Sequence, residues 1–217
     1  MARRKVILAE GQIYHIFNRG VEKRETFLDK RDYLRFFKTS EYYQMANPEV
    51  RFSFRKRPKV GKQTIPKKTQ KSVDIYAYCL MPNHFHFLLK QNIQNGISTF
   101  ISRLTNSYTR YFNIRYKRIG HLFQGSFKAV RIIGNEQLLH VARYIHLNPL
   151  IDYLVKDLKE FNFSSYPEYV GLKKGISSPD EILGQFQSIS DYEKFVLDQE
   201  DYARELKSIQ RLLLEDH

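Results

Sequence analysis

The sequence contains a single cysteine, and this scarcity excludes several kinds of structure. Cys79 is the only cysteine among 217 residues, so the chain forms no internal disulfide and no zinc site built on several cysteines. No apolar run reaches the roughly 18 residues that a transmembrane helix needs. The basic N-terminus is followed by an apolar stretch too short for a signal peptide. We therefore expect a cytoplasmic, nucleoid-associated protein without a membrane segment.

Acidic residues are scarce in the first two thirds of the chain. The whole sequence has 36 Lys and Arg against 23 Asp and Glu, a net charge of +13. Residues 1–151 hold 28 basic and 9 acidic residues, net +19, whereas residues 152–217 hold 8 and 14, net −6. This distribution favours a polyanionic partner, nucleic acid first, for the basic part. We predict one domain over residues 1–151 and an acidic, mostly helical extension over 152–217.

One stretch concentrates the positive charge. Residues 47–72 contain nine Lys and Arg and one Glu, with three prolines and one glycine. The stretch has neither helical nor strand periodicity, which indicates an inserted loop or a basic hairpin. A solvated tether would have the same composition, and the sequence alone leaves that alternative open.

The rest of the sequence alternates between short predicted strands and helices. Strands are expected over residues 13–18, 73–80, 84–89 and 127–133, and helices over 30–43, 98–116, 136–148 and within 188–215. Asn135 is a candidate N-cap for the helix that follows it, and Pro149 should stop that helix. Helices separated by strand pairs predict an α+β fold, a ferredoxin-like or RRM-like antiparallel sheet with helices packed on it.

Two histidines stand at alternate positions of one predicted strand. His84 and His86 point to the same face, with Cα atoms ~6.6 Å apart, so both imidazoles can reach one metal ion. Phe85 and Phe87 point to the opposite face, toward the core. Two histidines on a half-exposed strand can also be mere decoration, and a bare His-x-His pair favours that interpretation.

A tyrosine and an asparagine stand one turn apart on a later predicted helix. Tyr144 and Asn148 are at positions i and i+4, so they share a helix face about 6 Å apart along the axis. Leu138, Ala142 and Ile145 should pack inward beside that face. Tyr144 is one of 15 tyrosines, and taken alone it could simply line the rim of the core.

The two motifs together resemble the HUH single-tyrosine transposases, and most closely their REP-associated branch. The motifs are Met81-Pro82-Asn83-His84-Phe85-His86 and Tyr144-Ile145-His146-Leu147-Asn148-Pro149. Three further stretches carry the resemblance: Tyr14 to Gly20, Gly120 to Lys128, and Phe163 to Tyr166. The resemblance extends from about Tyr14 to Gly171 and leaves out the basic insert and the C-terminal tail.

The resemblance implies a metal-dependent transposase and single-strand DNA endonuclease with a tyrosine nucleophile. Tyr144 would attack phosphorus and form a 5′-phosphotyrosine, leaving a free 3′-OH. His84, His86 and Asn148 would bind Mg²⁺ or Mn²⁺, of which Mn²⁺ suits two imidazoles slightly better. The partner would be single-stranded DNA with a hairpin or repeat element, and the chain would act as a monomer or a homodimer.

Several other side chains are candidates for the same chemistry or for DNA contacts. Tyr108, Tyr111 and Tyr116 are rival nucleophiles, although Tyr108 has the spacing of a core residue. The extra histidines, His15, His121, His140 and His146, have no pairing pattern, and we treat His146, which should point to another helix face than Tyr144, as a non-ligand. The predicted DNA contacts are Arg19, Arg103, Arg110, Arg115, Lys117, Arg118 and Arg143, with Arg55, Lys56 and Arg57 in the insert. A solvated helix face is the ordinary explanation of the charges around residues 103–118, and a structural turn at Arg19-Gly20 is as plausible as a DNA contact by Arg19.

Two alternative functions remain open. An HUH replication initiator or relaxase usually places its tyrosine differently relative to the histidine pair. A catalytically silent module that binds single-stranded nucleic acid would use the exposed aromatic residues of a similar sheet. Such a module would tolerate loss of Tyr144 and leaves the histidine pair unexplained.

Overall fold

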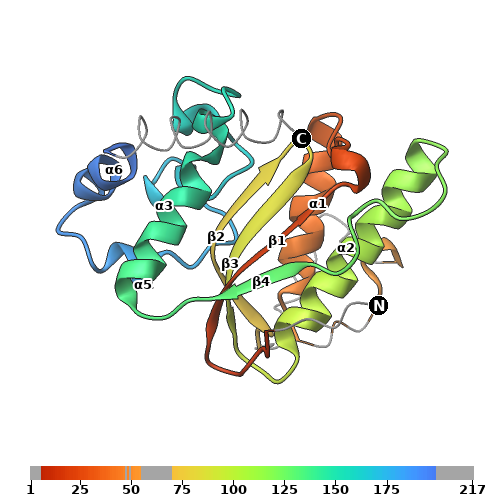
Figure 1. Ribbon diagram of the computed structural model, residues 1–217, viewed down its shortest axis with the longest axis horizontal. Helices are drawn as coiled ribbons and strands as arrows, with labels where there is room; N and C mark the ends of the chain where they lie inside the picture. The colour runs from red at the N-terminus through yellow and green to blue at the C-terminus, as the bar shows by residue number, and fades with distance from the viewer. Residues whose placement is uncertain (1–5, 47, 49, 55–69, 199–217) are drawn as a thin grey trace, which may run out of the picture. The chain divides into compact units, whose positions relative to one another are not determined.

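The computed structural model describes residues 6–46, 48, 50–54 and 70–198 (Figure 1). It confirms the predicted α+β fold, with one four-stranded antiparallel sheet in the order β2-β3-β1-β4. The strands are β1 (Ile13–Arg19), β2 (Val73–Met81), β3 (His84–Gln91) and β4 (Lys128–Arg131). The helices are α1 (Lys30–Tyr43), α2 (Gly96–Arg115), α3 (Asn135–Ile151), α4 (Tyr166–Tyr169), α5 (Asp180–Leu183) and α6 (Ile189–Leu197). None of the helices in the described part is both long and apolar enough to cross a membrane.

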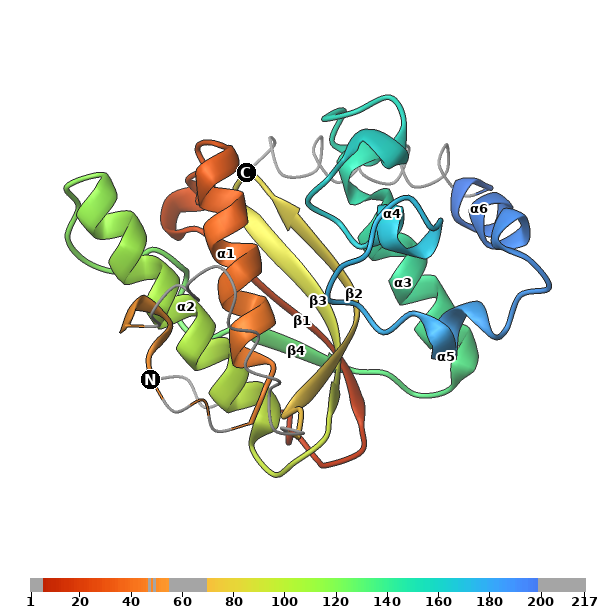
Figure 2. The same cartoon turned by 180° about the vertical axis from the view of Figure 1, so that it is seen from behind.

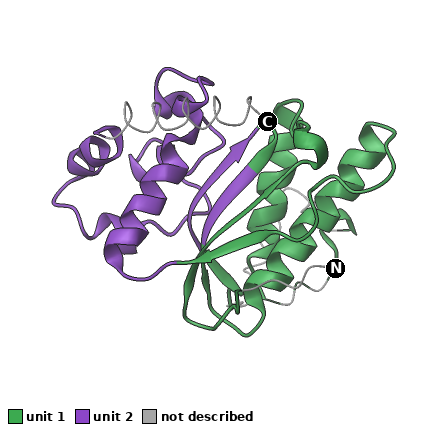
Figure 3. Ribbon diagram, viewed as in Figure 1, with its two compact units in different colours: residues 1–74, 82–84, 89–131 green, residues 75–81, 85–88, 132–217 purple. Residues whose placement is uncertain are grey.

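The chain divides into two compact units (Figure 3). Unit 1 comprises residues 1–74, 82–84 and 89–131, and unit 2 comprises residues 75–81, 85–88 and 132–217. The chain passes between the units within the β2–β3 hairpin, so His84 belongs to unit 1 and His86 to unit 2.

Unit 1 is built around two helices that pack side by side, α1 and α2 (Figure 2). The Asp29 side chain caps α1 by accepting a hydrogen bond from the Asp32 N–H. Between the helices, the Phe36 ring meets the Tyr108 ring edge to face, with centroids 5.0 Å apart. Both rings are fully buried, so they form part of the core of this unit.

The β1–β4 pair supplies the other layer of unit 1. The two strands are antiparallel, with Tyr14 opposite Arg131 and Phe17 opposite Lys128. Alternate β1 residues, including Tyr14 and Ile16, are fully buried, as expected for a strand with one face on the core. The predicted strand over 127–133 is shorter than expected, since β4 ends at Arg131.

Unit 2 holds α3 between the β2–β3 hairpin residues and the C-terminal segments. Nearly every residue of β2 is buried, so this strand is covered on both faces rather than on one. The Leu80 N–H donates to the Phe163 carbonyl at 2.9 Å, and the Ser165 N–H donates to the Tyr78 carbonyl at 2.9 Å. The stretch from Phe163 to Tyr166 therefore lies along β2.

The predicted ends of α3 are wrong at both termini. The helix contains Pro149 and continues to Ile151, and its N-cap is Gly134 rather than Asn135. Pro149 removes one backbone N–H donor, but Leu150 and Ile151 are buried and sustain the last turn. Apolar packing at this point outweighs the loss of one hydrogen bond.

The ends of the basic insert lie beside each other. Met45 pairs with Lys71 as an isolated antiparallel bridge. The Ala46 N–H donates to the Gln70 carbonyl, and the Ser72 N–H donates to the Gln44 carbonyl, both at 2.8 Å. This short ladder closes the base of the insert. Arg55, Lys56 and Arg57, three of the predicted DNA contacts, lie outside the described residues.

Candidate active site

The turn that precedes His84 is held by the end of β1. The Gly20 N–H donates to the Asn83 carbonyl at 2.8 Å, and Gly20 also pairs with Phe123 as an antiparallel bridge. A Cβ atom at Gly20 would lie 2.3 Å from the Arg24 carbonyl oxygen, so only glycine fits. Three of the stretches that carry the resemblance therefore meet at Gly20 within unit 1.

Asn83 orients the ring of His84. The His84 Nδ1 lies 2.6 Å from the Asn83 Oδ1, and the Asn83 Nδ2 donates to the Lys23 carbonyl at 3.2 Å. Because an amide oxygen only accepts, we assign the Nδ1–H tautomer to His84. That tautomer presents Nε2 as the nitrogen that can bind a metal, an arrangement typical of metal-ligating histidines.

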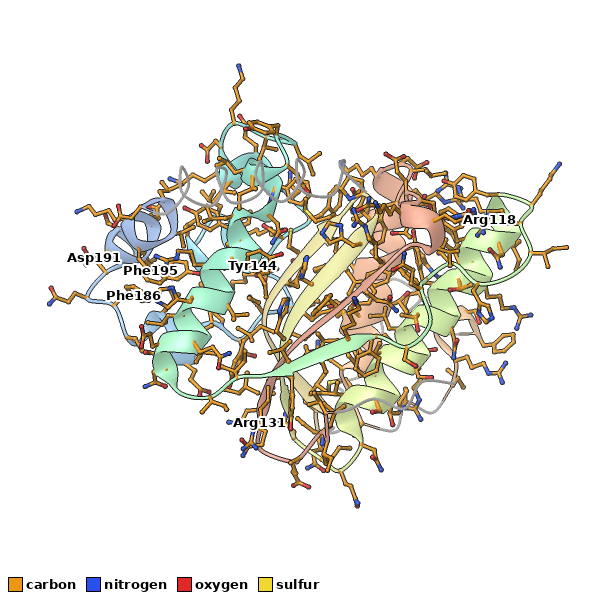
Figure 4. The ribbon with its side chains drawn as sticks, viewed as in Figure 1. Arg118, Arg131, Tyr144, Phe186, Asp191 and Phe195 are labelled. Carbon is orange, nitrogen blue, oxygen red and sulfur yellow. The ribbon has the colours of Figure 1, made fainter. Side chains whose placement is uncertain are left out.

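In unit 2, the proposed nucleophile lies against the second histidine. The Tyr144 ring, on α3 (Figure 4), meets the His86 ring edge to face, with centroids 5.5 Å apart and planes at 86°. His86 is 5% exposed, whereas Tyr144 is 46% exposed. The tyrosine is thus accessible to a large substrate, while the histidine beside it is shielded from solvent.

Asn148 completes the arrangement in unit 2. It is buried, and its Nδ2 donates to the Tyr144 carbonyl at 2.7 Å, one turn back along α3. This bond fixes the amide and leaves Oδ1 as the atom able to bind a cation. Burial raises the pKa of Tyr144, the hydrogen bond with Asn148 lowers it in part, and the charge of Asp152 raises it further. With its pKa raised, Tyr144 is a protonated phenol at neutral pH.

A buried polar chain fixes α3 within unit 2. His146 is completely buried, with its Nε2 2.7 Å from the Ser165 Oγ and its Nδ1 2.7 Å from the Tyr192 hydroxyl. Burial lowers the pKa of His146 to about 3, so the ring is neutral. Through the bond from Ser165 to the Tyr78 carbonyl, this chain links β2, α3 and α6. These contacts account for the burial of the His146 ring without a ligand role.

His84, His86 and Asn148 supply donor atoms of the kinds that a divalent cation binds. Two neutral imidazoles and one amide oxygen are ligands that Mn²⁺ accepts, and Mg²⁺ less readily. The Asn83–His84 hydrogen bond supplies the outer support that such ligands usually have. Across the described residues, no group of three His, Cys, Asp or Glu side chains could hold a metal; the present set differs because its third donor is an amide.

Arg143, a predicted DNA contact, is engaged by α6. Its side chain is buried, and its Nη1 donates to the Phe195 carbonyl at 3.2 Å. Its guanidinium lies 4.3 Å from the centroid of the Phe195 ring. Phe195 in turn packs on Phe186, with centroids 5.2 Å apart (Figure 4). Arg143 therefore anchors α6 to α3.

The remaining predicted DNA contacts in the described part of the chain belong to unit 1. Arg115 forms ion pairs with Asp29 at 2.5 Å and Asp32 at 2.6 Å, and the Arg118 Nη1 donates to the Asn113 Oδ1 at 3.0 Å. The other four side chains are exposed or half-buried: Arg19, Arg103, Arg110 and Lys117. DNA contact by these residues stays a prediction.

The rival tyrosines are engaged elsewhere in unit 1. The Tyr108 hydroxyl is buried and donates to the Thr26 carbonyl at 2.5 Å. The hydroxyls of Tyr111 and Tyr116 donate to the Asp32 carboxylate at 3.0 and 2.8 Å. Burial, followed by the bond to Asp32, raises the pKa of Tyr116 to about 12. None of the three lies in the unit that contains His86 and Asn148.

The other histidines have different surroundings. His15 lies on β1, and burial lowers its pKa to about 4. His121 is exposed in the loop that follows α2. His140 lies on α3, with its Nε2 3.9 Å from the Glu136 carboxylate and its Nδ1 2.5 Å from the Arg143 guanidinium.

Two residues important to the arrangement were not assigned a role from the sequence. Asn83 was part of a motif, but nothing in its spacing showed that it would orient His84. Gly20 was assigned to a turn, and its close approach to Arg24 depends on a fold that the sequence alone does not display. Two signals in the sequence could have indicated these roles. Asn83 directly precedes His84, and Gly20 ends a predicted strand.

Comparisons with known proteins support the resemblance. Residues 51–148 match the family described as "Transposase IS200 like", a span that includes His84, His86, Tyr144 and Asn148. A solved structure of a REP-associated tyrosine transposase bound to a REP hairpin has a similar fold, with a TM-score of 0.58 and 16% identity. The similarity covers 82% of this chain and 92% of that one. No curated protein matches the chain.

Proposed function

We propose that the chain cleaves and rejoins single-stranded DNA through Tyr144, as its match to the IS200-like transposase family over residues 51–148 supports. The substrate class is DNA that carries a hairpin or repeat element, by analogy with the hairpin bound to the similar structure. The observation that carries the proposal is the contact of the half-exposed Tyr144 ring with His86, beside Asn148 on the same helix.

In the proposed reaction, the attacking and leaving group is the Tyr144 side chain. The Tyr144 oxygen attacks phosphorus as the phenol proton leaves, and the bond from phosphorus to the 3′-oxygen breaks. The departing 3′-oxygen takes up a proton, and the 5′-phosphate stays on Tyr144. Rejoining reverses these steps, with a 3′-OH attacking phosphorus and the tyrosine oxygen leaving. The Asn148 side chain partly offsets the rise in the Tyr144 pKa that burial causes, which favours departure of the tyrosine oxygen.

A divalent cation fits this proposal, with His84, His86 and Asn148 as its ligands. When bound, such an ion polarises the phosphate and offsets the extra charge of the transition state. Asn83 would keep the His84 ring in the tautomer that binds. The buried chain of Ser165, His146 and Tyr192 would hold α3 so that Asn148 and Tyr144 keep their positions.

Formation of a covalent protein–DNA adduct tests the proposal directly. The full chain is incubated with Mn²⁺ and a pool of hairpin-bearing oligonucleotides labelled at the 3′ end, then denatured and run on a gel. Attachment through a 5′-phosphotyrosine transfers the 3′ label to the protein, whereas a 5′ label stays on the released fragment. Tyr144→Phe should bind DNA but give no adduct.

The matched control is Tyr153→Phe, which removes the hydroxyl of a tyrosine that is 67% exposed in the same unit. This variant should form the adduct at the rate of the unaltered chain. An adduct that persists in Tyr144→Phe, or that maps to Tyr108, contradicts the assignment. DNA binding by the unaltered chain without any adduct would instead indicate a catalytically silent binding module.

A further inference from the structure

A pocket of about 890 Å³ opens on unit 1 between α1, α2 and a short segment that contributes Pro48, Val50, Arg51 and Ser53. Among the residues that the structure describes, no Asp or Glu lines it, and six arginines do: Arg31, Arg35, Arg51, Arg103, Arg110 and Arg115. We call it the arginine pocket. Its arginines come from three segments that are distant in the sequence, so their convergence is a property of the fold. The volume is within the range of ligand-binding pockets and exceeds the need of a single phosphate group.

Most of this positive charge has no carboxylate to balance it. Arg115 pairs with Asp29 and Asp32. The other five arginines form no ion pair with any carboxylate in the part of the chain that the structure describes. The twenty residues of α2 contain no acidic residue at all. Like charges gathered in one concave site repel one another, so an anion bound there would stabilise the arrangement.

Arg35 provides independent support for a bound anion. Its Nε is buried and has no hydrogen-bond partner among the described residues. Its guanidinium lies 4.4 Å from the centroid of the Phe52 ring and 5.2 Å from that of Tyr111. Burial lowers the pKa of Arg35, since a cation is costly to desolvate without a partner. The aromatic rings hold the guanidinium at the wall of the pocket.

The same contacts decide which part of a nucleic acid the pocket suits. Arg35 covers the Phe52 and Tyr111 rings, and the Tyr111 hydroxyl is bonded to Asp32. Arg35 therefore occupies a face of each ring on which a base would otherwise stack, as in the usual mode of single-strand recognition. Arginines remain as the recognition groups, and their natural ligands are phosphates.

We propose that the arginine pocket binds consecutive phosphodiester groups of a nucleic-acid backbone, by charge and without contacts to bases. The pocket lies in unit 1 and contains none of the four residues assigned to cleavage. It therefore goes beyond the proposed cleavage site and rests on that proposal only for the choice of DNA. It predicts that DNA affinity and DNA cleavage depend on separate sets of side chains.

The test measures affinity in a Tyr144→Phe background, where cleavage does not interfere. Arg103→Ala combined with Arg110→Ala removes two arginines of the pocket. We expect the Kd to rise about tenfold for an unpaired oligonucleotide, with a salt slope shallower by about 1.4. An abasic oligonucleotide of the same length should show the same loss, because it keeps the phosphates. The same variants are also measured with a hairpin oligonucleotide. The comparison of its Kd with that of the unpaired strand shows whether the pocket prefers phosphates of a paired stem or of a single strand.

Two control variants keep the proposal falsifiable. Lys156→Ala combined with Lys174→Ala removes the same charge from exposed positions of unit 2 and should change the Kd less than threefold. Arg103→Lys combined with Arg110→Lys keeps the charge and should recover most of the affinity, which excludes misfolding as the cause. The proposal is overturned if the arginine variants lose no more affinity than the lysine control. It is also overturned if the Kd for the abasic oligonucleotide is the same with and without the arginine substitutions.

The two proposals fail in different ways. Adduct formation is scored in chains that keep Tyr144, at saturating DNA. Arginine-dependent binding without any adduct refutes the proposed cleavage and supports the pocket. If an adduct forms but the arginine substitutions do not change the Kd, only the proposal about the arginine pocket is refuted.

Discussion

Among individual side chains, Asn83 links metal affinity to a residue outside the proposed ligand set. Its Oδ1 accepts from the His84 Nδ1, so Asn83→Ala should leave the imidazole free to rotate and to change tautomer. We expect the Mn²⁺ concentration for half-maximal adduct formation to rise about 10–100-fold, as for other outer-shell partners. Asn162→Ala, at an exposed position, is the control. An unchanged Mn²⁺ requirement in Asn83→Ala would show that His84 is not a ligand.

His146 predicts how stability depends on pH. In the fold its pKa is lowered to about 3 by burial, whereas in the unfolded chain it takes up a proton near pH ~6.5. The unfolded state therefore binds more protons between these values, and stability falls as the pH falls. The stabilisation is complete above about pH 6.5 and is lost progressively down to about pH 3.

The size of this effect follows from linkage. Between pH 7 and pH 5, His146 should reduce the free energy of unfolding by about 2 kcal/mol. Urea unfolding at both pH values measures the loss, and His146→Gln should remove that share of it. His121→Gln, in an exposed loop, should leave the pH dependence intact. If both variants lose stability between pH 7 and pH 5 to the same extent, His146 does not carry the effect.

Among helices and strands, predictions from residue spacing and capping were correct where interactions between neighbours in the sequence decide the structure. The bounds of α1 agree with the prediction over residues 30–43, because its aromatic spacing faces the core and Asp29 caps its first turn. The end of α3 was wrong because a local rule about Pro149 competes with the burial of Leu150 and Ile151. The packing that decides the competition involves residues distant in the sequence, which periodicity does not reveal.

The end of β1 supports a prediction about the turn before His84. A Cβ at Gly20 would lie 2.3 Å from the Arg24 carbonyl oxygen and 2.9 Å from the Thr26 side chain. Gly20→Ala should therefore push the chain away and lower the free energy of unfolding by about 1–3 kcal/mol. The Gly20 N–H would lose its alignment with Asn83, so the Mn²⁺ requirement should rise as well. A variant with normal stability and normal Mn²⁺ dependence would show that the turn adapts without cost.

For the chain as a whole, the proposed site was predictable only in part. The spacing placed His84 with His86 on one strand and Tyr144 with Asn148 on one helix. The contact between His86 and Tyr144 depends on tertiary packing, and only the resemblance to a family anticipated it. The arginine pocket could not be predicted, because its arginines come from α1, from Arg51 and from α2, and no periodicity connects these segments.

The uneven charge of the chain leads to a last prediction, which concerns the basic insert. Residues 55–69 contain seven Lys and Arg and no Asp or Glu, and the hydrogen bonds from Ala46 to Gln70 and from Ser72 to Gln44 close the base of the insert. Changing the seven basic residues to Gln should therefore leave the fold intact. If each contacts a phosphate, the salt slope on single strands should become shallower by about 0.7 per residue, up to about 5 in all.

The measurement is the Kd of the unaltered and neutralised chains for an unpaired oligonucleotide, at several salt concentrations. Loss of affinity should be additive with that of the Arg103→Ala and Arg110→Ala pair, because insert and pocket would neutralise different phosphates. The matched control changes exposed lysines of the acidic C-terminal third, such as Lys156 and Lys174. An insert variant with an unchanged slope would mean that residues 55–69 do not neutralise DNA phosphates. The arginine pocket and the rest of residues 1–151 would then account for the salt dependence of binding.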